Sequence, residues 1–270
     1  PSNNQAIGYW ADKSGTGHHA TVYGNTNSYK PKYYSAAMNS KPTVRFDGSN
    51  DYLILQNGRS DFHQWDKLTV LVVYEDYGSS NWRRLMGNVD HQTGGWCLSW
   101  DGGGGNRYRF RIVGTSGGDD LNRNYTKQQT HILTFTYNGS LRVGRIDGLT
   151  SQMTDTGTLP DNPNADFVIG GTGRDSGTPS SASKVRISEV LIYNDVPAAA
   201  DIAKLEGYLA HKWNLTNRLA GGHTYASSAP TFADPLGAVD LTLYWGTNDG
   251  GENPAEWENE VALGRYFKEQ

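Results

Sequence analysis

The chain has 270 residues with 33 glycines, 11% aromatic residues and only 19% charged residues, a composition typical of many strands joined by tight turns. The formal net charge of −4 provides no generally basic surface, so we expect no nucleic-acid partner. No stretch approaches the roughly 20 apolar residues that cross a bilayer, so we expect no membrane insertion. A single cysteine, Cys97, excludes an intramolecular disulfide and a thiolate zinc cluster.

Short apolar runs with alternating texture recur between Gly, Asn and Asp residues through the first two thirds of the chain. Such runs predict strands of an all-β sandwich, because alternate side chains of a strand point to opposite faces. The runs lie at residues 43–46, 51–55, 68–74, 96–100, 107–113, 131–137, 141–146, 166–170 and 185–193.

One C-terminal helix follows these runs. Asp195 can cap it, Pro197 suits its first turn, and apolar residues recur at helical spacing. The apolar stripe consists of Ile202, Leu205, Leu209 and Trp213, and we expect it to pack on the sandwich.

The remainder of the chain differs in composition and charge. Residues 223–240 contain Pro230 and Pro235 and predict a wrap or linker, and residues 241–270 predict a partial following β module. We therefore assign residues 1–222 to the sandwich with its helix, and the rest to an extended tail.

Four segments, in order, resemble bacterial laminin-G-like domains. The most specific is a His-led strand at His131 that turns at Asn138-Gly139 into a strand ending in Asp147-Gly148. The other three begin at Trp10, Val44 and Ile187, and the last leads into the predicted helix.

This resemblance implies a concanavalin-A-like jelly roll, that is, a two-sheet antiparallel sandwich, in an extracellular or cell-surface protein. It also implies a glycan partner and other domains of the same parent chain, and the tail resembles the start of a fibronectin-type-III-like module. The family includes lectins, adhesion domains, carbohydrate-binding modules, glucanases and alginate lyases, so the fold does not fix the activity.

Catalytic signatures of these relatives are incomplete in this sequence. The Glu-x-Asp-x-x-Glu run of the glucanases is absent, and the lyase pattern survives only as the fragments Gln129-Thr-His131 and Tyr266-Phe-Lys268. We therefore expect a non-catalytic chain, with a polysaccharide lyase or glycosidase as an alternative.

The run at 107–112 is the strongest candidate for binding. Alternation places Arg107, Arg109 and Arg111 on one face of a strand, and we expect their guanidinium groups to project to solvent, where they suit carboxylate or sulfate. The alternative is an ordinary solvated strand whose arginine stems cover apolar neighbours.

A second group of candidates lies just upstream: Trp82, Arg83, Arg84, Asp90 and His91. An exposed indole can stack on a sugar ring while polar side chains bond its hydroxyls. We expect Trp82 to be exposed. Trp96, Leu98 and Trp100 share one face of a strand, which could equally face a ligand or the core, and for Trp96 we favour the core.

The loop with Asp47, Asn50 and Asp51 offers three oxygen ligands for Ca²⁺, although the same residues also suit an ordinary turn. The leading hypothesis is a non-catalytic carbohydrate-binding module, possibly for uronate or sulfated polysaccharide, in a larger secreted or surface protein. An adhesion or spacer domain that binds protein or nothing is the main alternative.

Overall fold

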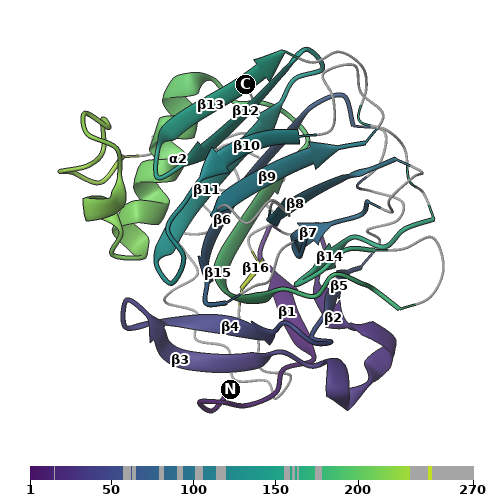
Figure 1. The fold of residues 1–270 in the computed structure, drawn as a ribbon. Helices are drawn as coiled ribbons and strands as arrows, with labels where there is room; N and C mark the ends of the chain where they lie inside the picture. The colour runs from purple at the N-terminus through teal and green to yellow at the C-terminus, as the bar shows by residue number, and fades with distance from the viewer. Residues whose placement is uncertain are drawn as a thin grey trace.

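The computed structural model describes residues 1–231, apart from residues 15, 57–61, 63–64, 79–81, 90–93, 101–105, 114–119, 155–158, 160–161, 163 and 174–177, together with residues 243–244. Its strands form two antiparallel sheets packed face to face (Figure 1). The predicted two-sheet antiparallel sandwich with one helix is therefore confirmed.

The first sheet, called the front sheet, is the larger one. All of its pairings are antiparallel. Its order is β10 (Asp120–Asn124), β9 (Arg107–Ile112), β8 (Trp96–Trp100), β7 (Arg84–Gly87), β14 (Val168–Ile169), β5 (Leu53–Leu55), β2 (Ala20–Val22), β1 (Tyr9–Asp12) and β16 (Leu243–Tyr244).

The second sheet, called the back sheet, contains the longest strands. Its order is β13 (Leu149–Thr154), β12 (Leu141–Ile146), β11 (Thr130–Tyr137), β6 (Leu68–Asp76), β15 (Lys184–Tyr193), β4 (Lys41–Asp47) and β3 (Lys32–Met38). Three short 3-10 turns complete the described elements: η1 (Tyr23–Asn25), η2 (Asn27–Tyr29) and η3 (Thr216–Arg218).

The main core lies between the sheets and consists of the inward side chains of both. On β9 these are Tyr108, Phe110 and Ile112, and on β8 Trp96 and Trp100 take the same position. The expectation that Trp96 is buried is therefore confirmed. Aromatic side chains fill much of this layer because a single large ring removes a large apolar area from water.

The helix α2 (Ala199–Lys212) packs on the outer face of the back sheet (Figure 1). Its buried side chains Leu205 and Leu209 contact the outward Leu71, Val73 and Leu191 of the central strands. These strands therefore carry apolar side chains on both faces, which explains their continuous apolar sequence.

The predicted cap of the helix is wrong. Ala198 occupies the N-cap position without a side-chain hydrogen bond, whereas the Asp195 carboxylate pairs with Lys67 Nζ at 2.9 Å. The Asp195 carbonyl oxygen also accepts a hydrogen bond from Thr69 Oγ1 at 2.7 Å. Asp195 thus fixes the end of β15 to the start of β6 instead of starting the helix.

The described segment after the helix folds back on it through Tyr225. Tyr225 lies so close to Gly207 that a Cβ atom on this glycine would come within 2.4 Å of the tyrosine Cβ. His211 Nε2 also contacts the Tyr225 carbonyl oxygen at 2.9 Å.

Of the predicted module at 241–270, the structure describes only β16, which pairs with β1 through Tyr244 and Leu243 opposite Ala11 and Asp12. The remainder lies outside the described residues, so the division at residue 240 stays a prediction. Among the described residues, α2 is too short and polar to span a membrane.

Candidate functional site

The outer face of the front sheet carries the arginines that the sequence singled out. Arg107, Arg109 and Arg111 alternate on β9 with the buried side chains of the core, so their predicted common face is confirmed. Across β8, Ser99 lies opposite Arg109 and Cys97 lies opposite Arg111. On β7, Arg84 lies opposite Ser99.

These arginines influence the pKa of Cys97 on β8. Burial raises the pKa of the Cys97 thiol, while the positive charges of Arg84, Arg111 and Arg109 act in the opposite direction. The charges of three arginines therefore act on one small buried side chain. We call Arg84, Arg107, Arg109 and Arg111 the arginine cluster.

The expectation that all three β9 guanidinium groups project to solvent is wrong for Arg109, which is only 4% exposed. Arg107 is exposed and Arg111 is half-buried. Its guanidinium packs against the Trp82 ring, 4.8 Å from the ring centroid, with the small Ser99 opposite it on the neighbouring strand. Arg84 is also buried, so it is not placed to contact a ligand directly.

Trp82 lies beside this cluster and is 52% exposed, as predicted. The Arg109 guanidinium lies over the indole at 4.8 Å from the ring centroid. Arg84 Nη1 donates a hydrogen bond to the Trp82 carbonyl oxygen at 3.0 Å. The two buried arginines thus hold the exposed tryptophan from below.

The backbone of Trp82 is also unusual. Its φ of 64° lies in the left-handed region, which a bulky residue rarely adopts. Such a conformation costs about 1–3 kcal/mol and persists only where the surroundings enforce it. An exposed aromatic side chain held in this way is more typical of a binding surface than of a folding requirement.

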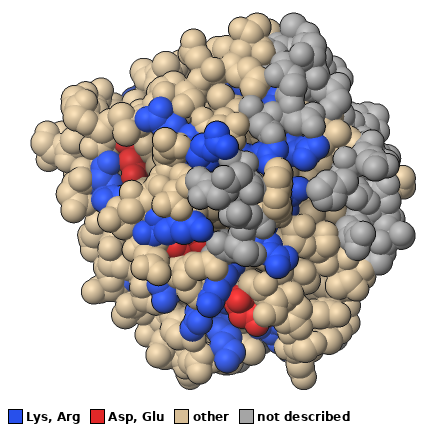
Figure 2. Space-filling view, in the orientation of Figure 1, with Lys and Arg blue, Asp and Glu red and all other residues tan. Residues whose placement is uncertain are grey.

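The other predicted binding residues are only partly placed. Arg83 is half-buried, and its charge acts on the Tyr52 hydroxyl. Asp90 and His91 lie outside the described residues. In Figure 2, Lys and Arg side chains gather across the displayed side of the molecule, with scattered acidic side chains among them.

The candidate calcium loop forms the hydrogen bonds of an ordinary turn. Asp47 Oδ1 accepts from the Ser49 backbone N–H at 2.7 Å and from that of Asn50 at 3.4 Å. Asp51 Oδ2 accepts from the Asp47 N–H at 2.8 Å. Burial raises the pKa of Asp51 to about 7, against partial stabilisation of its charge by that hydrogen bond.

Metal-binding clusters of three or more His, Cys, Asp or Glu side chains do not occur within the described part of the chain. The Asp47 loop supplies two carboxylates and one amide, a smaller set of side chains than calcium usually takes, so backbone carbonyls or water would have to complete it.

Sequence reasoning missed a cavity of about 360 Å³ on the opposite sheet, beside the end of the helix. None of the predicted site residues lines it. Its walls come from turns that lie far apart in the chain and carry mostly amide side chains, which form no recognisable pattern in the sequence.

Comparisons with known proteins support the fold. No protein-family model and no curated protein matches the sequence. A structure of Trypanosoma rangeli sialidase with a 2,3-difluoro-KDN ligand is similar at a TM-score of 0.52 and 17% identity, over 78% of this chain and 32% of that chain. A second structure of the same enzyme, with 2,3-difluorosialic acid as a covalent intermediate, gives 0.51 and 16%, over 77% and 32%. This chain therefore spans about a third of the length of these sialidases.

Proposed function

We propose that the chain is a non-catalytic module that binds an acidic polysaccharide through Trp82 and the arginine cluster. The observation that carries the proposal is the exposed indole of Trp82, which the buried Arg109 and Arg84 hold beside the more accessible Arg107 and Arg111. This combination offers a stacking platform and positive charge on one surface.

The two groups have different roles in binding. Because Arg109 covers one side of the indole, its other side is available to the C–H face of a sugar ring. Arg107 and Arg111 then meet carboxylate or sulfate groups of neighbouring sugars, for which a guanidinium is a fork-shaped donor. Arg84 and Arg109 act as positioning residues for Trp82.

Each exposed ion pair contributes less than about 1 kcal/mol, but several pairs along one polyanion add together. Such binding weakens as salt screens the charges. We therefore expect moderate affinity and strong salt dependence.

Two further lines support a glycan partner. The sequence segments resemble laminin-G-like domains, and the Trypanosoma rangeli sialidase structures that share the fold hold acidic sugar ligands. An extracellular or cell-surface location and further domains of the same parent chain belong to the same proposal.

We also propose a calcium ion in the Asp47 loop, held by Asp47, Asn50 and Asp51. The buried Asp51 carboxylate supports it, because a cation would compensate a charge that burial disfavours. Chelator should then lower the melting temperature and added calcium should restore it, whereas an unchanged melting curve would exclude a structural ion.

Retention on immobilised polysaccharides tests the proposal. The chain should be retained by alginate or fucoidan and pass through neutral dextran, and Trp82→Ala should reduce the retention. Appearance of unsaturated product would instead support a lyase. Failure to be retained by any glycan would support the adhesion or spacer alternative and overturn the proposal.

A further inference from the structure

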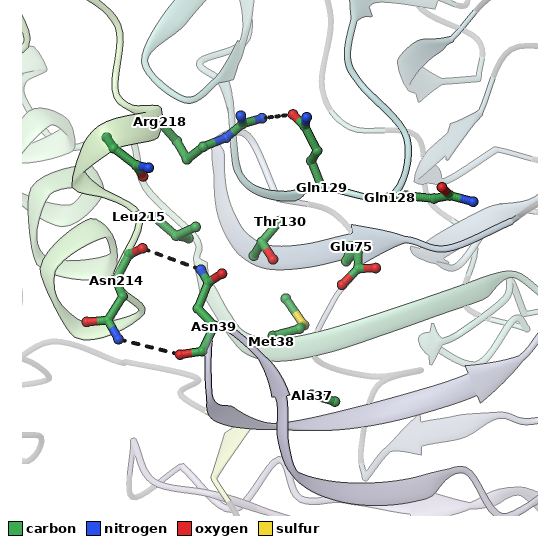
Figure 3. Close-up of a pocket in the computed structure, with 11 residues that line it drawn as sticks. Ala37, Met38, Asn39, Glu75, Gln128, Gln129, Thr130, Asn214, Leu215 and Arg218 are labelled. Atoms are coloured by element: carbon green, nitrogen blue, oxygen red, sulfur yellow. Dashed lines mark hydrogen bonds between the residues drawn. The ribbon is translucent and has the colours of Figure 1, made fainter.

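The cavity on the back sheet lies where three separate parts of the chain meet (Figure 3). One wall is the tip of the β3–β4 hairpin, the second is the turn after α2, and the floor comes from β6 and the start of β11. The polar side chains of the lining include those of Asn39, Glu75, Gln128, Gln129, Asn217 and Arg218.

The hairpin tip and the end of the helix are both turns that contain residues with positive φ. Asn39 and Ser40 both have positive φ, as a two-residue type I′ turn requires between Met38 and Lys41. Asn214 also has positive φ directly after the helix, and the Leu215 N–H donates to the Ala210 carbonyl at 2.7 Å, the bond of a Schellman motif.

The amide of Asn39 joins these two turns. Its Nδ2 donates to the Trp213 carbonyl oxygen at 3.1 Å and to the Asn214 carbonyl oxygen at 3.4 Å, so the hairpin caps the end of the helix. Asn214 Nδ2 returns a hydrogen bond to the Asn39 carbonyl oxygen at 3.5 Å. This wall of the cavity is therefore fixed before any ligand binds.

The floor is fixed by two further contacts. Arg186 Nη1 lies 2.6 Å from Glu75 Oε1, which orients the carboxylate, and Oε2 is a second acceptor on the same group. Arg218 Nη2 donates to Gln129 Oε1, which leaves the Gln129 amide nitrogen as a donor. Gln128 has a left-handed backbone, and its own amide side chain lies at the rim of the cavity.

The lining favours a neutral, hydroxyl-rich ligand. Glu75 is paired with Arg186, and Arg218 Nε lies 3.9 Å from Asp147 Oδ2, so both charged side chains of the lining have a counter-charge. The amides both donate and accept, as vicinal hydroxyl groups do. A volume of about 360 Å³ lies in the range of small-molecule sites, about 300–1,000 Å³. Binding of a polyanion is disfavoured, because the C-terminal end of α2, which is the negative end of the helix dipole, lies beside the cavity.

We propose that this cavity binds one uncharged sugar residue, separately from the arginine cluster on the front sheet. Glu75 accepts from ligand hydroxyls, and the amides of Gln129 and Asn217 bond the remaining ones. The proposal does not depend on the acidic-polysaccharide function, because it uses the other sheet and a different ligand chemistry.

NMR of the isotope-labelled full chain tests it with uncharged probes: the methyl glycosides of glucose, galactose, mannose and N-acetylglucosamine. At least one should shift the amide signals of residues 128–130 and 214–218. The double variant Gln129→Ala/Asn217→Ala should weaken that binding about tenfold or more, from the loss of two hydrogen bonds.

Both substituted residues are exposed amides outside the regular core, so the variant should keep the wild-type spectrum elsewhere. Gln56→Ala removes an exposed amide far from the cavity and should leave binding unchanged. No shift with any glycoside, or shifts only around Trp82, would overturn the proposal. Failure to bind polyanions would not affect it.

Discussion

Trp82 combines three properties that seldom occur in one residue: large exposed area, a left-handed backbone and a cation stacked on its ring. Where only the fold requires a positive φ, glycine is the usual residue, because it adopts this backbone conformation without strain. The strain at Trp82 therefore supports the proposed role of the indole in glycan binding.

Replacing Trp82 separates strain from binding. Trp82→Gly should be more stable than Trp82→Ala by about 1 kcal/mol, since alanine keeps the unfavourable φ whereas glycine does not. Both should lose the stacking contribution to glycan binding. Denaturant unfolding of the two variants measures the difference, and equal stabilities would mean that the backbone relaxes without the indole.

The raised pKa of Asp51 predicts how the stability of the protein changes with pH. Its pKa is raised from 3.8 to about 7 in the folded chain, mainly by burial. Between these two pH values the folded state therefore holds a proton that the unfolded state has released. In calcium-free buffer its contribution to stability should therefore be full below about pH 4 and be lost as the pH rises through about 7.

Asp51→Asn should flatten this dependence, because the amide oxygen can still accept the Asp47 N–H and does not ionise. Urea unfolding at several pH values between 4 and 8 checks it. A variant with the same pH profile as the wild type would show that Asp51 ionises as easily as an exposed carboxylate.

Among the elements, the turn from β12 into β13 explains why a strand led by His131 pairs with one that ends in Asp147-Gly148. His131 Nδ1 lies 2.7 Å from Asp147 Oδ2, and its Nε2 lies 2.8 Å from the Thr126 carbonyl oxygen. Both ring nitrogens of His131 therefore have a partner inside the protein. Asp147 Oδ1 also accepts from the Ile132 N–H at 2.9 Å.

Removing one member of this buried pair should be costly. Asp147→Ala should lower the free energy of unfolding by about 3–5 kcal/mol, because the His131 ring and the Ile132 N–H lose their acceptor inside the protein. Thermal unfolding measures it. A loss below about 1 kcal/mol would show that water replaces the carboxylate, as it does at the surface.

The sequence predicted the helix and most of the long strands, because their apolar periodicity is long enough to read, but not the seven-residue β3, whose side chains are mostly exposed or half-buried. It missed β13, whose side chains are mostly exposed, and β7, which is buried on both faces, since neither alternates. It found the arginine face by alternation but not the burial of Arg109, whose guanidinium packs against the Trp82 ring in the folded chain. The cavity could not be predicted, because tertiary contacts alone bring its turns together.

At the scale of the whole molecule, the two sheets present different surfaces. The back sheet is covered in part by α2 and offers an amide-lined cavity beside it, whereas the front sheet offers an exposed aromatic ring among arginines. The two candidate sites thus lie on opposite outer faces of one rigid sandwich.

We expect the tail beyond Pro235, which is rich in acidic residues, to contribute little to the stability of the sandwich. Among the described residues, truncation after Pro235 removes β16, which pairs with β1 over two residues. The melting temperature should then fall by no more than a few degrees. Aggregation or a large drop in calorimetry would place the tail within the sandwich and move the boundary.

The most direct test of the central claim is the salt dependence of the affinity for the retained polysaccharide, measured by titration calorimetry on the wild type and three variants. Trp82→Ala should weaken binding about tenfold or more, and Arg107→Ala should weaken it and reduce its dependence on salt. Lys32→Ala, which removes an exposed positive charge on the back sheet, should leave it unchanged. Affinity that falls steeply with salt and depends on Trp82 and Arg107 is the predicted result. Affinity that is indifferent to salt and to both substitutions would contradict a binding surface at the arginine cluster.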